Sequence, residues 1–201
     1  DKRMATYFEY STSPWFTTIP ENFSTTIEYD EQTTPYYYNF FGPHWVGQTF
    51  TVDNMGAGQR FCIQNVSFKL LRMNSPGMIC VGLYNTDETG LPTGPVLATG
   101  SLDGKTLPFN SSWVTIPLSP YNLSSHTQYA VILNVSGSAA DFLYLGVDLV
   151  MPTYTGGKLL VSHDGAATFS TLEADKVIAT PKEIGALLGL TPIKTQVMKR
   201  A

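Results

Sequence analysis

Alternation of apolar and polar residues with a period of two is the feature that most restricts the fold of this chain. Val66, Phe68 and Leu70 are separated by Ser67 and Lys69, which indicates a strand with one buried face. Similar alternation or a short apolar run recurs at residues 79–83, 114–118, 129–135 and 142–147. These segments predict a series of short β-strands.

Turn-forming residues separate these segments. Residues 87–94 (Asp-Glu-Thr-Gly-Leu-Pro-Thr-Gly) and 102–105 (Leu-Asp-Gly-Lys) are rich in residues that favour turns. No helical pattern lies between the predicted strands, whereas parallel strands need crossover connections that are usually helices. Residues 48–178 are therefore expected to form one antiparallel β-sandwich or barrel.

Residues 1–47 differ in composition and are expected to form an extended arm. They hold 13 of the 25 aromatic residues, and residues 4–59 contain six acidic residues and no Lys or Arg. Because an exposed apolar surface of this size usually marks an interface, we expect the rings to pack on the arm's own sandwich or, preferably, on a neighbouring subunit. The aromatic residues predicted at this assembly interface are Tyr7, Phe8, Tyr10, Trp15, Phe16, Tyr36, Tyr37, Tyr38, Phe40 and Phe41.

Residues 179–201 predict a short capped helix followed by a basic tail. Thr180 and Glu183 form a capping box, Pro181 occupies the first helical position and Gly189 is placed to end the helix. Ile184, Leu187 and Leu188 make one apolar face, which must pack on the domain or a neighbour because two turns are unstable alone. From Lys176 onward there are five basic residues and one acidic residue, a charge of +4 against −6 for residues 4–59. This complementarity favours head-to-tail contact between copies.

The two cysteines are expected to be free, buried thiols. Cys62 and Cys80 flank an apparent hairpin whose turn is residues 74–77 (Asn-Ser-Pro-Gly). In that pairing Cys62 lies about nine residues beyond the position opposite Cys80, on the order of 30 Å at ~3.3 Å per residue. This separation is far beyond disulfide reach.

Residues that could carry catalysis are scattered. His44, His126 and His163 lie far apart in the sequence without the spacing of a zinc site, and no nucleophile elbow or phosphate-binding loop appears. The carboxylates fall mainly in turns, where Asp bonds the nearby backbone. We therefore expect no enzymatic activity, no catalytic residues, no cofactor and no metal ion. Calcium at turn carboxylates is the alternative left open, at Asp87 with Glu88 or at Asp141 with Asp148.

Charge and hydropathy limit the partners. The net charge of −4 lacks the basic character of a nucleic-acid-binding protein, and no apolar run approaches the ~20 residues that a membrane span needs. Only 14% of the residues are charged, as in many extracellular or virion β-proteins. Residues 1–4 (Asp-Lys-Arg-Met) are not followed by an apolar signal core. The explanations are a signal already removed, a natural start at Met4 behind a tag, or export inside a virus particle.

Exposed aromatic side chains on a sandwich can stack on sugar rings. Trp113 and Tyr121 are the candidates for glycan stacking within the sandwich, and residues 36–38 (Tyr-Tyr-Tyr) are candidates within the arm. Burial of Trp113 between strands is the favoured alternative.

A series of strand and turn motifs resembles a broad group of jelly-roll sandwich domains in bacteriophage and archaeal virion proteins and in microbial surface proteins, including carbohydrate-binding-module-like domains. The motifs are residues 48–51 (Gln-Thr-Phe-Thr), 65–70, 74–77, 90–94, 97–100, 113–116, 123–130 and 162–165 (Ser-His-Asp-Gly). The resemblance covers about residues 48–175 and implies a jelly-roll fold with a virion or surface role. It carries over no catalytic or ligand-binding residue.

Two functions follow as hypotheses. The first is a non-catalytic structural subunit of a virion or extracellular assembly, such as a capsid decoration, tail-fibre or filament component. It contacts copies of itself and other subunits through its terminal segments. The second is a carbohydrate-binding or adhesion module that recognises surface glycans. Neither involves nucleic acid or membrane insertion, and removal of the arm should abolish the first function while leaving the second intact.

Overall fold

The computed structural model describes residues 36–52, 60–148, 157–171, 183–184 and 186–193. They form two antiparallel sheets and a short 3₁₀ helix, η1 (Gly104–Thr106). Sheet I contains β1 (Tyr36–Phe40), β3 (Arg60–Met73), β6 (Ser112–Leu123), β8 (Phe142–Asp148), β11 (Glu183–Ile184) and β12 (Ala186–Ile193). Sheet II contains β2 (Trp45–Thr51), β4 (Met78–Thr86), β5 (Pro92–Asp103), β7 (Gln128–Val135), β9 (Leu159–Ser162) and β10 (Ser170–Thr171).

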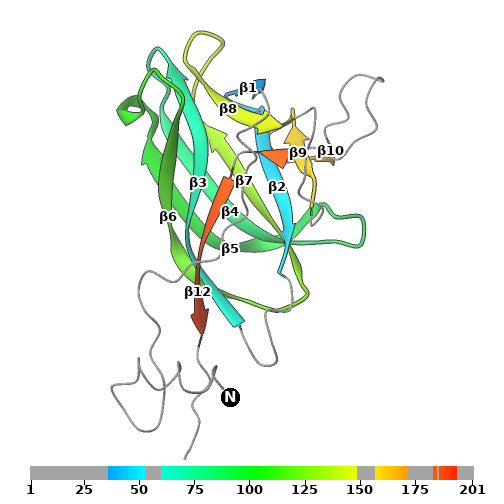
Figure 1. The fold of residues 1–201 in the computed structure, drawn as a ribbon. Coiled ribbons are helices and arrows are strands. Elements are labelled where there is room, and N and C mark those ends of the chain that lie inside the picture. The colour runs from blue at the N-terminus through cyan, green and yellow to red at the C-terminus, as the bar shows by residue number, and fades with distance from the viewer. Residues whose placement is uncertain (1–35, 53–59, 149–156, 172–182, 185, 194–201) are drawn as a thin grey trace, which may run out of the picture.

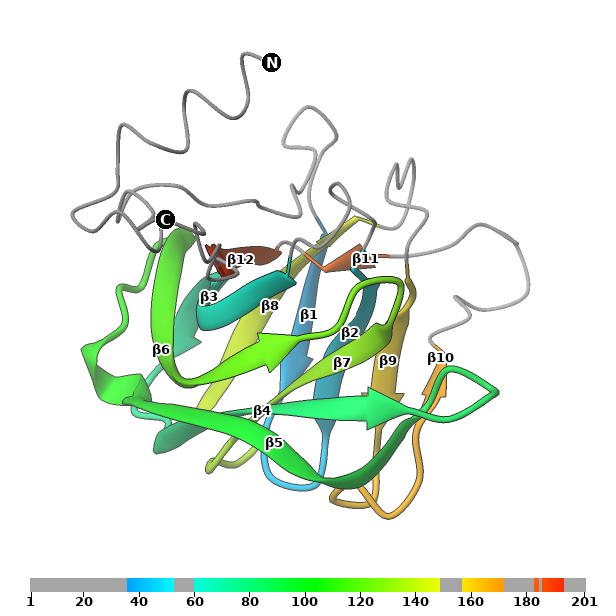
Figure 2. The ribbon, with the colours of Figure 1, turned by 90° about the horizontal axis from the view of Figure 1, so that it is seen from below.

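The two sheets form two layers, as Figures 1 and 2 show. In sheet I the order is β1-β8-β3, with β6 on the far edge of β3, and in sheet II it is β10-β9-β2-β7-β4-β5. From β1 to β9 the chain changes sheet at every step except between β4 and β5. Residues distant in sequence therefore become neighbours within each sheet.

The core lies between the two sheets. The five predicted strand segments lie within β3, β4, β6, β7 and β8, so these predictions are confirmed. Phe68 and Leu70 of sheet I and Val131 and Leu133 of sheet II belong to one core cluster, and all are at most 2% exposed. Phe50 stacks on Tyr129 with ring centroids 5.9 Å apart. The alternation thus places one side of each strand in a shared core, and the predicted all-β, sandwich-like fold is confirmed.

The turn at residues 74–77 does not close a hairpin, contrary to the prediction. β3 pairs with β6, β8 and β12, whereas β4 pairs with β5 and β7. The turn carries the chain from sheet I to sheet II, and the Gly77 N–H donates to the Ser136 carbonyl at 2.7 Å. Turn residues mark where a strand ends, but long-range pairing decides which strand becomes its neighbour.

The two cysteines lie in different sheets and are both free. Cys62 is partly buried, and desolvation raises the pKa of its thiol. Cys80 is exposed, so the prediction of burial is wrong for it. Its neighbours Ile79 and Val81 face the core, which turns Cys80 to the outer face of sheet II.

The C-terminal segment forms strands where the sequence predicted a helix. Residues 180–182 lie outside the described residues, but residues 183–184 form β11 and residues 186–193 form β12. β12 pairs with β3 at residues 60–68, and β11 pairs with the end of β8. A two-turn helix has little stability of its own, whereas a strand here satisfies backbone groups along the edge of β3. Ile184, Leu187 and Leu188, which were predicted to form one face of a helix, therefore lie in strands.

Candidate ligand-binding site

The outer face of sheet II has an unusually buried floor. Because Val131 and Leu133 of β7 face the core, their neighbours Ala130 and Ile132 point outward. Ala130, Ile132 and Leu160 of β9 are nevertheless at most 1% exposed. The partly buried side chains packed against them are Trp45, Tyr84, Leu91 and Phe169. A second, smaller apolar cluster thus lies outside the sandwich core.

Glycines on this face let large side chains lie close to the sheet. A Cβ atom on Gly82 would lie 2.7 Å from the Tyr84 ring, and one on Gly47 would lie 2.5 Å from the Ile132 Cδ1 atom. The Tyr84 ring therefore covers Gly82 where a larger residue would displace it. The Trp45 indole Nε1 donates to the Gly42 carbonyl at 3.1 Å, which holds that ring at the start of β2.

These side chains border a hollow of about 620 Å³. Its volume falls within the ~300–1,000 Å³ typical of small-molecule sites. The lining combines three aromatic residues with the two loops on either side of them. The lining residues are Trp45, Tyr84, Asp87, Leu91, Pro92, Thr93, Gly94, Ala166, Ala167, Thr168 and Phe169.

The β4–β5 loop is organised by Asp87. Its Oδ1 accepts hydrogen bonds from the Thr89 N–H at 2.8 Å, the Thr89 hydroxyl at 2.6 Å and the Leu91 N–H at 3.1 Å. These bonds, that of the Thr89 hydroxyl first, lower the pKa of Asp87 below its usual range. Gly90 adopts a φ of 82°, a left-handed conformation that glycine accepts without strain. The carboxylate thus holds the loop that carries Leu91 to the hollow.

The β9–β10 loop is organised in the same way by Asp164. Its Oδ1 accepts bonds from the Ser162 hydroxyl at 2.8 Å and the Thr168 N–H at 2.9 Å, and its Oδ2 accepts from the Thr168 hydroxyl at 2.6 Å. These bonds, led by that of the Thr168 hydroxyl, lower the pKa of Asp164 to about 2. This loop leads directly to Phe169, so Asp164 positions the opposite wall.

The arrangement suits a ligand with flat apolar faces and polar edges. Aromatic side chains offer flat surfaces to the apolar faces of such a ligand, and loop hydroxyl and backbone groups can bond polar substituents at its edges. Asp87 lines the hollow, but the bonds to its Oδ1 give it a structural task in the loop.

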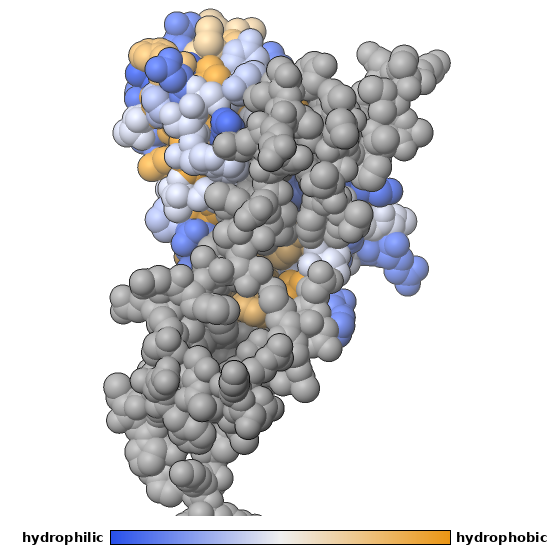
Figure 3. Space-filling view, viewed as in Figure 1, coloured by the Kyte–Doolittle hydropathy of each residue, from blue (hydrophilic) through white to orange (hydrophobic). Residues whose placement is uncertain are grey.

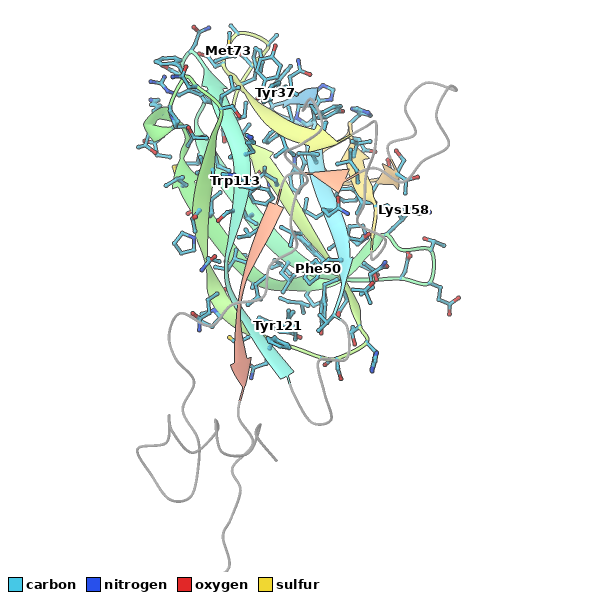
Figure 4. The ribbon with its side chains drawn as sticks, viewed as in Figure 1. Tyr37, Phe50, Met73, Trp113, Tyr121 and Lys158 are labelled. Atoms are coloured by element: carbon cyan, nitrogen blue, oxygen red, sulfur yellow. The ribbon has the colours of Figure 1, made fainter. Side chains whose placement is uncertain are left out.

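The two residues predicted to stack on glycans do not meet. Trp113 is 36% exposed and lies on β6 opposite Lys69, so the alternative of full burial does not hold. Tyr121 lies eight positions farther along β6, on the order of 26 Å at ~3.3 Å per residue. It packs against the core and contacts Tyr129 edge-on at 6.3 Å. Figure 4 shows the two side chains at different heights along sheet I.

The predicted assembly residues fall into two groups. Tyr7, Phe8, Tyr10, Trp15 and Phe16 lie outside the described residues. Tyr36 begins β1, Tyr37 is 41% exposed, and Phe40 is fully buried in the core. Tyr38 and Phe41 are partly buried against that core. The last residues of the predicted arm therefore supply β1 and the start of β2.

Of the turn carboxylates considered for calcium, Asp87 and Asp141 bond groups of their own or neighbouring loops. Asp141 accepts from the Ser75 N–H at 3.1 Å and from the Ser138 hydroxyl at 3.2 Å. Among the described residues, no three His, Cys, Asp or Glu side chains gather where they could hold a metal ion together. No helix in the same ranges has the length and apolarity that a membrane crossing requires.

Sequence reasoning missed Tyr84 and Phe169, and assigned Trp45 to the arm. The signals at hand were the turns at residues 87–94 and 162–165, which form the two loops beside these rings. Nothing local indicates that both loops border one hollow, because that depends on the order of strands in sheet II. Compared with known proteins, the chain matches no family model and no curated protein sequence.

Proposed function

We propose that this chain is a non-catalytic, carbohydrate-binding jelly-roll module of a virion or extracellular surface assembly, and that the hollow on sheet II is its binding site. The observation that carries the proposal is the hollow of about 620 Å³ that Trp45, Tyr84 and Phe169 help to line. These three rings are held in place by packing against the buried apolar cluster of sheet II. Sugar rings suit this lining, because their C–H faces are apolar and can pack on aromatic rings, whereas their edges carry hydroxyl groups.

The strand order supports the jelly-roll part of this proposal. A jelly roll has eight strands in two sheets of four, joined by two Greek keys. The first eight strands divide into β1-β8-β3-β6 and β2-β7-β4-β5, as that topology requires. The further strands β9 and β10 extend sheet II and bring the second loop to the hollow.

The one carboxylate among the described residues of the hollow has a structural task, which accords with the non-catalytic role that we propose. Glycoside hydrolysis needs two carboxyl groups, about 5–9.5 Å apart, on either side of a sugar bond. Asp87 is the single carboxylate among the described residues that line the hollow. Hydrogen bonds from its own loop lower the pKa of Asp87 and take up its Oδ1 atom. An ionised carboxylate bonded in this way stabilises the loop but has no proton to donate as a general acid.

A glycan array followed by calorimetry tests the proposal. The full chain is expected to bind one class of oligosaccharide, and Trp45→Ala should weaken that binding at least about tenfold, roughly 1.4 kcal/mol. Trp113→Ala is the matched control on the outer face of sheet I and should bind as the unmodified chain does. Equal loss in both variants, or loss in Trp113→Ala alone, would contradict the assignment of the site.

A second candidate function is assembly through the terminal segments. Its support is the composition of the terminal segments, six acidic residues and no Lys or Arg in residues 4–59 against a charge of +4 from Lys176 onward. Within the chain, β11 and β12 show that a terminal segment can add strands to sheet I. Because β1 begins at Tyr36, a truncation that tests the arm must stop at residue 35. Light scattering should give oligomers for the full chain and a folded monomer for residues 36–201. Equal masses would argue against an assembly role for the arm.

A further inference from the structure

Two histidines face each other beside the hollow, on strands that the fold brings together. His44 precedes β2 and His163 follows β9, and these strands pair antiparallel with Trp45 opposite Ser162. The two histidines therefore extend the same ladder by one residue on each strand. Figure 2 shows the β1–β2 turn and the β9–β10 loop side by side at this end of the molecule.

The backbones on both sides of this pair are fixed. Beyond it, the Gly165 N–H donates to the Pro43 carbonyl at 2.9 Å, and within the turn the His44 N–H donates to the Phe41 carbonyl at 3.0 Å. The His44 ring also packs edge-on against Phe41, with centroids 5.3 Å apart. The two imidazoles are thus held near each other before any ligand arrives.

The ring nitrogens of the pair point at each other at an accessible position. The Nδ1 atoms of His44 and His163 lie 2.9 Å apart in an exposed contact, and their ring centroids are 5.2 Å apart. At this distance one Nδ1 carries a proton and donates a hydrogen bond to the lone pair of the other. A ring whose proton moves to Nε2 presents Nδ1 as a second free lone pair.

The spacing fits two neighbouring ligands of one metal ion. Imidazole nitrogens bind such ions at about 2.0–2.1 Å, so two ligands at a right angle lie about 2.9 Å apart. A tetrahedral angle would require about 3.4 Å at the same bond length. Right-angled nitrogen sites are the geometry of Cu²⁺ and Ni²⁺.

From this geometry we infer that His44 and His163 form a two-histidine site for Cu²⁺ or Ni²⁺, with water in the remaining coordination positions. On binding, the shared proton passes to Nε2 of its own ring or to solvent, and small rotations of both rings direct the two lone pairs at the metal. Neither redox change nor covalent chemistry is involved.

The site would join the β1–β2 turn to the β9–β10 loop. Residues 166–169 of that loop line the hollow, so the metal would stiffen one of its walls. The inference stands independently of what the hollow binds, because the histidines do not line it.

Titration of the full chain with Cu²⁺ and Ni²⁺ tests the inference. Cys80→Ser serves as the background for Cu²⁺, because Cys80 is an exposed thiol that this ion can oxidise. One Cu²⁺ per chain should bind with two nitrogen donors in its electron paramagnetic resonance spectrum. His44→Ala and His163→Ala should each lower the affinity for either metal at least tenfold and leave at most one nitrogen donor.

The third histidine supplies the control. His126 is exposed at a φ of 54°, and His126→Asn suits that left-handed conformation. It should keep the affinity and both nitrogen donors. His163→Gln, which retains a polar side chain, guards against a loss caused by altered folding and should behave as His163→Ala does. Unchanged metal binding in His44→Ala or His163→Ala, or its loss in His126→Asn, would overturn the inference.

Discussion

The outer faces of the two sheets differ in how they use aromatic residues. On sheet I, Tyr37 and Trp113 are exposed by 41% and 36% and are spread over strands at opposite edges. The part of this face that is coloured in Figure 3 is largely hydrophilic with scattered apolar residues. On sheet II, Trp45, Tyr84 and Phe169 line one hollow and pack against a buried apolar cluster.

Loops account for the difference between the faces. The β4–β5 and β9–β10 loops border the hollow. Asp87 and Asp164 order these loops internally, because each accepts hydrogen bonds from the hydroxyl and the N–H of a nearby threonine. An aromatic side chain on the outer face of a strand is exposed to solvent unless a loop lies beside it. Beside an ordered loop the same side chain can form one wall of a binding site.

The largest effect is expected from the core that both faces share. Phe50 lies on the inner side of β2, 2% exposed, and its strand presents Trp45 to the hollow. Phe50→Ala should lower the free energy of unfolding by about 3–5 kcal/mol, because it leaves a cavity between the sheets. Urea denaturation measures this loss. A loss as small as that from Trp113→Ala would mean that the strand is not packed as described.

Two glycine-to-alanine variants, one on the outer face of each sheet, compare the roles of the two faces in binding. Gly82→Ala on sheet II would place a methyl group 2.7 Å from the Tyr84 ring, and should weaken ligand binding by about three- to tenfold, or ~0.6–1.4 kcal/mol. Gly146→Ala on sheet I would meet the Lys69 Cβ atom at 3.2 Å and should leave ligand binding unchanged. Calorimetry with the best glycan compares them, and equal binding by both variants would argue against a role for the Tyr84 ring.

Acid should weaken the β9–β10 loop before it affects the sheets. The folded-state pKa of Asp164 is lowered to about 2, from about 3.9 in an unfolded chain. Its stabilising effect is therefore complete only above about pH 5 and is lost progressively as the pH falls through about 2. Asp164→Asn should be less stable than the unmodified chain at pH 6, and the gap should narrow steadily between about pH 5 and pH 2. Thermal unfolding across this range measures the gap; a gap independent of pH would contradict the role of the carboxylate.

The smallest effect is expected on sheet I. Trp113→Ala removes an exposed ring and should change the free energy of unfolding by no more than about 1 kcal/mol. Chemical denaturation of this variant beside Phe50→Ala gives the comparison. A loss of several kcal/mol would show that the outer face of sheet I is covered in solution.

Local sequence patterns predicted the strands but not their neighbours. The alternation at Val66, Phe68 and Leu70 is a local consequence of one-sided burial and could be read directly. The turn at residues 74–77 looked like a hairpin, because turn chemistry is the same whether the chain returns beside its own strand or crosses to the other sheet. The C-terminal capping box likewise predicted a helix, which the pairing of β12 with β3 overrides.

The candidate site depended still more on long-range order. Trp45, Tyr84 and Phe169 are far apart in the sequence, and only the order β9-β2-β7-β4 in sheet II brings their strands together. The loop aspartates could be recognised as turn residues. Their joint position around one hollow, and the contact of His44 with His163, follow from the topology alone.

The indole N–H signals of the tryptophans give the most direct test of the central claim. Trp45 borders the hollow, whereas Trp113 lies on sheet I, so one ¹H–¹⁵N spectrum reports on both faces. During titration with the best oligosaccharide from the array, the Trp45 indole signal should shift progressively while that of Trp113 stays in place. A shift of the Trp113 signal with Trp45 unmoved would place binding on sheet I and contradict the account.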